Sequence, residues 1–174
     1  MAVRRSSRRF SSARLTAVAR RLLDASTLFA LATVAPGGRA HVNTAYFAWN
    51  ASFDIVWLSA PDARHSRNIH RDPSAAIAVF DSRQRWGGKD RGIQLFGRAV
   101  ETRGRGASEA ERLYARRFRD YEIGEYPAYR FYRFRPRRLK LFDERAFGGG
   151  VFVTARVTPR GLAWERTEEL AGDD

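Results

Sequence analysis

The sequence predicts a mainly β protein, an antiparallel barrel of six or seven strands with two or three flanking helices. Short apolar or alternating segments recur at the spacing typical of barrels, separated by turns rich in Gly, Pro and Asp. Strands and helices do not alternate regularly, which disfavours a doubly wound parallel sheet. With 174 residues and 44% hydrophobic content, the chain is long enough for one domain with its own core.

Each predicted element follows from a local pattern. Strands are expected over 27–34, 39–49, 55–59, 75–80, 91–101 and 151–157, and the strand-like segments 129–134 and 139–142 are separated by Pro136. Both faces of 39–49 carry apolar residues, so we expect that strand to be covered on both sides. Gly97 predicts a bulge or a close backbone approach. Helices are expected over 12–24, over a short segment stopped by Pro73, and over 108–121 behind a capping box of Ser108 and Glu111.

The ends of the chain differ in composition from its middle. Residues 1–12 are rich in Arg and Ser and lack an apolar period, so we expect a disordered basic arm that is dispensable for folding. Residues 13–158 form the expected domain, and 159–174 an acidic, frayed tail. The arm lacks the apolar region of a secretory signal, and we expect a cytoplasmic protein.

Composition excludes several kinds of site. The chain has no cysteine, which rules out disulfides and thiolate chemistry, and its three histidines do not stand at metal-ligand spacing, so no metal is expected. No apolar run is long enough for a membrane span. The net charge of +13 attracts anions, but its arginines are spread along the chain and match no standard nucleic-acid module.

One stretch, W-L-S-A-P-D-A-R-H-S-R-N-I-H-R-D-P (57–73), has the composition of a phosphate site. A strand runs into a turn in which Asp62 is a good N-cap for a short helix. Arg64 and His65 follow in the first helical turn, where free amides and the helix dipole favour an anion. Ser59 adds a hydroxyl at the end of the strand. The alternative interpretation is a solvated, arginine-rich surface turn.

Four segments, taken in order, carry a family resemblance. They are L-F-A-L-A-T-V-A-P-G-G-R-A-H-V, I-V-W-L-S, R-H-S-R-N-I-H-R-D-P followed by A-A-I-A-V-F, and R-G-I-Q-L-F-G-R-A-V-E. They resemble the FMN-binding split-barrel family, the pyridoxamine 5′-phosphate oxidase-like group, over residues 15–157. The resemblance implies a split barrel that forms a homodimer, with flavin bound in clefts between the subunits.

The resemblance also implies positions for the cofactor. The basic residue that holds the FMN phosphate in the family corresponds to His65, beside Arg64. Arg67 and Arg71 either assist phosphate binding or form the solvated side of the short helix. Asn43 falls near a polar position of the second strand that contacts the phosphate or the ring.

Main-chain groups around Tyr46, Leu58 and Ser59 are expected to face the isoalloxazine ring. No catalytic residue is assigned, because flavin chemistry needs mainly orientation and electrostatic tuning from the protein. The C-terminal substrate motif of true pyridoxamine phosphate oxidases is absent from G-L-A-W-E-R-T-E-E-L, so vitamin B6 oxidation is not expected.

The expected function is therefore that of an FMN-dependent oxidoreductase acting on a small molecule. Two alternatives stay open: a non-enzymatic protein that binds flavin or haem, and a deazaflavin-dependent reductase. The alternation of aromatic residues with arginine over 129–135 also allows base stacking, but an alternating strand with one core face and one solvated face explains it better.

Overall fold

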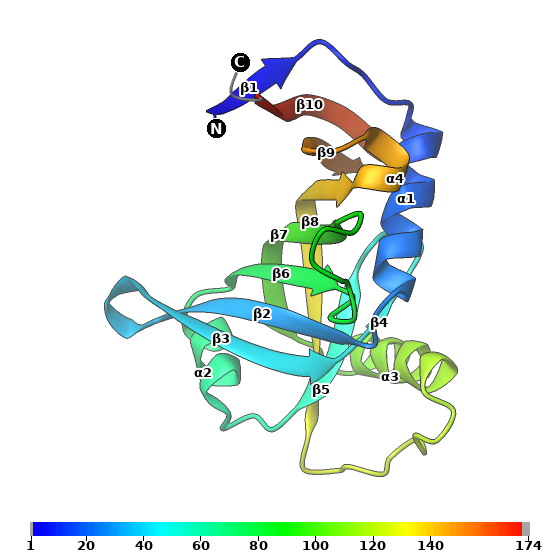
Figure 1. The fold of residues 1–174 in the computed structure, drawn as a ribbon. Helices are drawn as coiled ribbons and strands as arrows, with labels where there is room; N and C mark the ends of the chain where they lie inside the picture. Colours follow the sequence, from blue (N-terminus) through cyan, green and yellow to red (C-terminus); the bar gives the residue numbers. More distant parts are fainter. Residues whose placement is uncertain (1, 172–174) are drawn as a thin grey trace. The chain divides into compact units, whose positions relative to one another are not determined.

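The computed structural model of the protein describes residues 2–171. Strands account for 46% of these residues and helices for 24%, which confirms the mainly β, antiparallel fold class. The described chain forms two compact units: a first unit of residues 2–26, 78–95 and 137–171, and a second unit of Thr27–Ile77 and Phe96–Pro136. Three strands contribute residues to both units, β6 (Ser74–Phe80), β7 (Arg91–Glu101) and β8 (Arg130–Asp143) (Figure 1).

The second unit begins with a hairpin of β2 (Leu28–Ala35) and β3 (Arg39–Tyr46). The register runs from Leu28 opposite Tyr46 to Ala35 opposite Arg39, around the 3-10 turn η1 (Pro36–Gly38). Gly37 adopts φ +75° in this turn, a conformation that a side chain disfavours. The segment expected as one strand over 39–49 is divided, because the chain leaves β3 after Tyr46 and pairs again as β4 (Ala48–Trp49).

Aromatic rings around β5 (Ile55–Ser59) form the core of the second unit. Trp57 is fully buried, stacks on Tyr132 at 5.6 Å between ring centroids, and meets the edge of Phe29 at 5.4 Å. Strand β5 pairs with β8 along its whole length and with the two-residue β4 at Ile55 and Val56. This burial explains why β5 has the bounds that its apolar sequence predicts.

Gly97 lies where two backbones approach each other. A Cβ atom built at this residue would stand 2.1 Å from the carbonyl oxygen of Arg135 and 2.8 Å from Cα of Pro136, far inside contact distance. The predicted close approach is thus confirmed. The interruption expected at Pro136 is wrong, because β8 runs through the proline as one strand, and proline tolerates extended backbone while giving up only its own donor.

Helix α3 (Arg105–Arg117) packs against β4 and β5 in the second unit. It begins three residues before the expected capping box. Its N-cap residue is Gly104, so no side chain caps the helix. Glu111 instead holds the segment after the helix: its Oε1 accepts from the hydroxyl of Tyr121 at 2.9 Å and from the amide of Gly124 at 2.8 Å.

The first unit contains strands in the order β1 (Ala2–Ser6), β10 (Gly161–Ala171), β9 (Val151–Thr158) and the second half of β8. Helix α1 (Ser12–Asp24) has the predicted bounds, is capped by the hydroxyl of Ser11, and packs its apolar stripe near β10. A short helix, α4 (Glu144–Phe147), was not predicted and is capped by the buried Asp143.

The termini differ from the sequence expectation. Ala2–Ser6, expected within a disordered arm, pairs as β1 with β10, which itself occupies most of the expected tail. The register places Arg4 opposite Glu169 and Arg5 opposite Glu168, and opposite charges across strands stabilise such a ladder. Met1 and residues 172–174, which belong to the expected arm and tail, lie outside the described residues.

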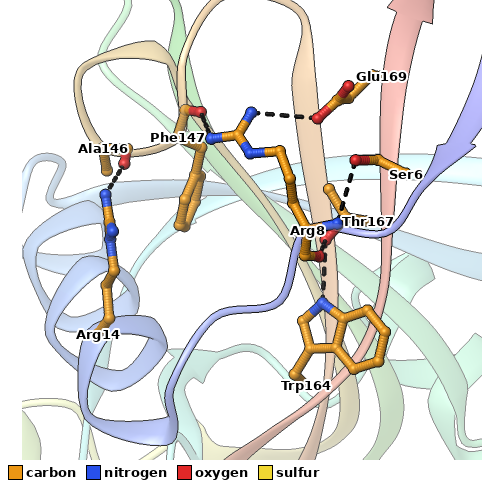
Figure 2. Close-up of polar contacts among 8 residues, drawn as sticks. All are labelled: Ser6, Arg8, Arg14, Ala146, Phe147, Trp164, Thr167 and Glu169. Carbon is orange, nitrogen blue, oxygen red and sulfur yellow. Dashed lines mark hydrogen bonds and ion pairs between the residues drawn. The ribbon is translucent and has the colours of Figure 1, made fainter.

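Arg8 attaches the segment after β1 to the rest of the first unit (Figure 2). Its Nη2 donates to the carbonyl of Phe147 at 2.6 Å and its Nη1 to Glu169 at 3.1 Å, while its own carbonyl accepts from the hydroxyl of Thr167 at 2.7 Å. The guanidinium of Arg14 donates to the neighbouring carbonyl of Ala146. The segment 7–11 is therefore held by charged donors rather than by apolar burial alone.

No helix among residues 2–171 combines the length and the apolar character needed to cross a lipid bilayer.

We predict that Arg8→Ala lowers the free energy of unfolding by about 1–2 kcal/mol, because it removes charge-assisted hydrogen bonds to a half-buried carbonyl and a carboxylate. Urea unfolding followed by circular dichroism measures this loss. Arg20→Ala, at an exposed arginine of α1, is the matched control and should change stability by less than about 0.5 kcal/mol. Equal stability of the Arg8 variant and the wild type would show that Arg8 does not hold segment 7–11 in place.

Candidate functional site

The predicted sequence of strand, turn and short helix is present in the second unit. Strand β5 ends at Ser59, and α2 (Arg64–Arg71) follows and stops before Pro73. The expected N-cap is wrong by one residue: Ala63 occupies that position and no side chain caps the helix. Ala63 donates to the carbonyl of Ala60, and this turn leaves Asp62 outside the helix, where its carbonyl accepts from Arg67.

Helix α2 has two chemically different sides. His65, Ser66, Asn68 and Ile69 are buried, whereas Arg64, Arg67 and Arg71 are exposed. The spacing of the arginines, three and then four residues, places them on one face of a helix. The buried side fixes the helix and the exposed side presents a row of guanidinium groups.

His65 was expected to hold a phosphate beside Arg64, but the structure buries it. Only 6% of the residue is exposed, and its Nε2 lies 2.7 Å from Oγ of Ser59. Burial, with a smaller effect from His41, lowers the pKa of His65 below its ordinary value. The ring is neutral near pH 7 and is bound to the strand before the helix, so it does not have the charge or exposure of a phosphate ligand.

A second polar contact joins α2 to the β2–β3 hairpin. The side-chain amide of Asn68 donates to Oγ1 of buried Thr33 at 3.0 Å, and Nδ1 of His41 lies 3.5 Å from the same oxygen. Ser66 donates to the carbonyl of Ala60 at 2.8 Å and closes the turn. These contacts set the position of the arginine row relative to β3.

The arginine row forms one wall of a pocket of about 460 Å³ with a mainly polar lining. Arg64, Arg67 and Arg71 come from α2, and Arg39 and His41 come from the start of β3. Residues Ala35, Pro36, Ala40 and Asn68 complete the lining. We call this space the arginine pocket.

The arginine pocket carries positive charge without a counter-charge. None of the lining residues is a carboxylate. Within the described chain, Arg39, Arg64 and Arg71 form no ion pair, and Arg67 uses one nitrogen to bind the Asp62 carbonyl. Four guanidinium groups repel one another, and this repulsion is relieved when an anion enters.

The pocket brings together only some of the residues expected from the sequence. Arg64 and Arg67 line it, but Asn43, half-buried on β3 opposite Leu31, does not. Tyr46 lies at the far end of β3, 56% exposed, with its ring 5.7 Å from that of Phe118.

The other two expected residues point into the protein. Leu58 packs against the apolar cluster beneath α3, and Ser59 is engaged by His65. Arg39 was not expected in the site, and no role there was assigned to His41. Arg39 and His41 lie some 25 residues before α2 along the chain, so the sequence alone does not place them beside it.

The described residues contain no group of three or more His, Asp or Glu side chains that could hold a metal ion.

The sequence and the structure both match known proteins. A family model described as Pyridoxamine 5′-phosphate oxidase matches residues 15–142. This match spans most of the chain, and the protein belongs to that family. The resemblance inferred from the sequence segments is confirmed. No functionally curated protein matches the sequence.

Solved structures with the same fold belong to proteins that are described in different ways. A protein of the pyridoxinephosphate oxidase family from Clostridium acetobutylicum, related to general stress protein 26, is 12% identical, with a TM-score of 0.64 over 85% of this chain and 97% of its own. HutZ, the haem storage protein of Vibrio cholerae, is 19% identical, with a TM-score of 0.62 over 71% and 92%. An F420 reductase is 22% identical, with a TM-score of 0.54 over 69% and 94%. These similarities confirm the split-barrel fold.

The buried His65 predicts a pH dependence of stability. Because its pKa is lowered in the folded state, the unfolded chain takes up the proton first as the pH falls below the ordinary value of 6.5. The contribution of His65 is therefore complete above pH 6.5 and is lost between that pH and the lower pKa of the folded state.

We expect His65→Gln to reduce the fall in unfolding free energy between about pH 7.5 and pH 5, as measured by urea titrations at several pH values. His70→Gln, which changes an exposed histidine on the same helix, should leave the contribution of His65 in place. An unchanged pH profile in the His65 variant would show that the ring is not held as a buried neutral group.

Proposed function

We propose that the protein binds FMN and acts as an FMN-dependent oxidoreductase on a small molecule, with the FMN phosphate in the arginine pocket. The observation that carries this proposal is the set of four arginines that line the pocket without a carboxylate. Membership of the pyridoxamine 5′-phosphate oxidase family supports a flavin as the occupant.

The chemistry of the pocket fits a phosphate ester. A phosphate oxygen pair accepts two parallel N–H donors from one guanidinium, and charged hydrogen bonds of this kind are worth about 1.5–3 kcal/mol each. Arg64 and Arg71 have their donors available, and Arg39 approaches from the opposite element.

The remaining positions are assigned to the ring by the family resemblance. Asn43, Tyr46 and the main chain at Leu58 and Ser59 are proposed to contact the flavin or to shape its surroundings. The bound flavin would supply the redox chemistry, and the protein would orient it and set its electrostatic environment. His65 takes a supporting role in this proposal, because it holds α2 against β5 through Ser59.

A deazaflavin is the second candidate, because it also carries a phosphate group that the arginine pocket would accept. The fold similarity to an F420 reductase is compatible with it. Haem is suggested by the fold similarity to HutZ. It lacks a phosphate, so it is a poorer match for a pocket lined by four arginines. The absorbance spectrum of the purified protein separates the three: flavin bands support the proposal and a Soret band contradicts it.

Arg64→Ala and Arg71→Ala are each expected to weaken FMN binding by about ten- to a hundredfold, the equivalent of one lost charged hydrogen bond. Riboflavin, which lacks the phosphate, should bind the wild type and both variants with the same weak affinity. Fluorescence titration of apoprotein with the two ligands measures the difference.

Arg98→Ala, an exposed arginine on β7 that does not line the pocket, is the control and should keep wild-type FMN affinity. His65→Gln should retain the discrimination between FMN and riboflavin. If the Arg64 and Arg71 variants lose riboflavin as strongly as FMN, the phosphate lies elsewhere.

We also propose that the chain forms a homodimer through the outer face of the β2–β3 hairpin. The expectation that both sides of this strand are covered is wrong for the chain on its own, because the side chains of β3 alternate between half-buried and exposed. Val42 and Tyr46 are 64% and 56% exposed, and Leu28, opposite Tyr46, is 45% exposed. An apolar sheet face of this kind marks an interaction site, and a second copy of the chain is the partner that the family resemblance implies.

Val42→Glu should therefore dissociate the dimer, since a buried carboxylate without a partner opposes association. Light scattering should give about twice the chain mass of 19.8 kDa for the wild type and the single-chain mass for the variant. Val3→Glu, at a valine that is 59% exposed on β1, is the matched control and should remain dimeric. A wild-type mass of one chain would contradict the proposal.

A further inference from the structure

A second pocket lies in the same unit, bordered by α3, by β8 and by the segment that follows α3. Its volume is about 540 Å³, within the range of sites that hold small ligands, and its lining is mainly apolar. It shares no lining residue with the arginine pocket. We call it the α3 pocket.

The apolar wall of the α3 pocket is held in place by hydrogen bonds. Leu113 contributes from the helix, and Ile123, 65% exposed, contributes from the following segment. Glu111 fixes that segment on both sides of Ile123, through the hydroxyl of Tyr121 and the amide of Gly124. An apolar surface that is open to solvent is thus built at a defined position rather than on a loose loop.

The polar part of the lining consists mainly of cationic donors. Arg112 and Arg116, one helical turn apart on α3, form no ion pair within the described chain. Glu109 is the one carboxylate among the lining residues, and it already accepts from Arg105 at 3.0 Å. Two positive charges are therefore left for a ligand.

Arg133 lies deeper in the same lining and is incompletely bonded. Its side chain is 14% exposed, its Nε is buried without a hydrogen-bond partner, and its Nη2 makes only long contacts, 3.7 Å to Glu109 and 3.4 Å to the carbonyl of Gly106. Arg133 also interacts electrostatically with Asp54. Burial raises the pKa of Asp54, and the charge of Arg133 offsets part of that rise. A buried guanidinium in this state gains from an additional acceptor.

We propose that the α3 pocket binds a small carboxylic acid with an apolar body. The carboxylate would accept from Arg112 and Arg116, with Arg133 below them, and the hydrocarbon part would lie against Leu113 and Ile123. The mainly apolar lining sets this ligand apart from the phosphate ester proposed for the arginine pocket. The two proposals are independent, because the pockets use different elements and different side chains.

The test is a ¹⁹F NMR titration of the full chain with 4-fluorobenzoate, and with its uncharged analogue 4-fluorobenzamide. We expect saturable binding of the benzoate at millimolar concentration and about tenfold weaker binding of the benzamide, which cannot offer a charged acceptor. Inorganic phosphate should not displace the benzoate.

Arg112→Gln and Arg116→Gln are each expected to weaken benzoate binding about tenfold, and both residues are exposed, so the fold is kept. Arg119→Gln, just beyond α3, and Arg64→Gln, in the arginine pocket, are the matched controls and should bind benzoate like the wild type. Absence of saturable benzoate binding, equal binding of the benzamide, or an equal loss in the control variants would each overturn the proposal.

Discussion

The contact between His65 and Ser59 determines how α2 is presented. A short helix of eight mostly polar residues has little intrinsic stability, and its orientation is set by the side that it buries. Nε2 of His65 against Oγ of Ser59, together with Asn68 against Thr33, fixes that side. The arginines therefore lie on the exposed side of α2, toward the start of β3. The positively charged pocket is thus a consequence of neutral hydrogen bonds behind it.

In this arrangement, different residues anchor α2 and supply the positive charge. From the family resemblance we expected His65 to supply the charge that holds a phosphate. Here the buried ring anchors the helix. Its lowered pKa favours the neutral form, which the nearby arginines do not repel. The charge is supplied by neighbours of permanent charge, Arg64 and Arg71, and by Arg39 from another element.

Elements governed by local apolar patterns were predicted well, and those governed by distant partners were not. The bounds of α1, β5 and β7 follow directly from the spacing of their apolar residues. Strand β1 has no such pattern, because it is stabilised by charges on β10 that lie more than 160 residues away along the chain. The same reason explains the site: Arg64 and Arg67 were found beside one another in the sequence, whereas Arg39 and His41 join them only through the β2–β3 hairpin. The burial of His65 was missed because Ile69 is the only apolar residue of α2, and one apolar residue does not define an inner face.

The pairing of β1 with β10 has a consequence for biosynthesis. Ala2 is synthesised long before its partner in the ladder, Ala171. Three separate stretches of chain make up the first unit, and the last of them begins at Arg137. The nascent chain therefore carries an unpaired β1 and the unshielded apolar stripe of α1 until β10 has been made, and this unit completes its fold only then. Closing contacts over such a sequence distance is slow, and a chaperone that covers the first 26 residues would act at the stage when the chain is most exposed to aggregation.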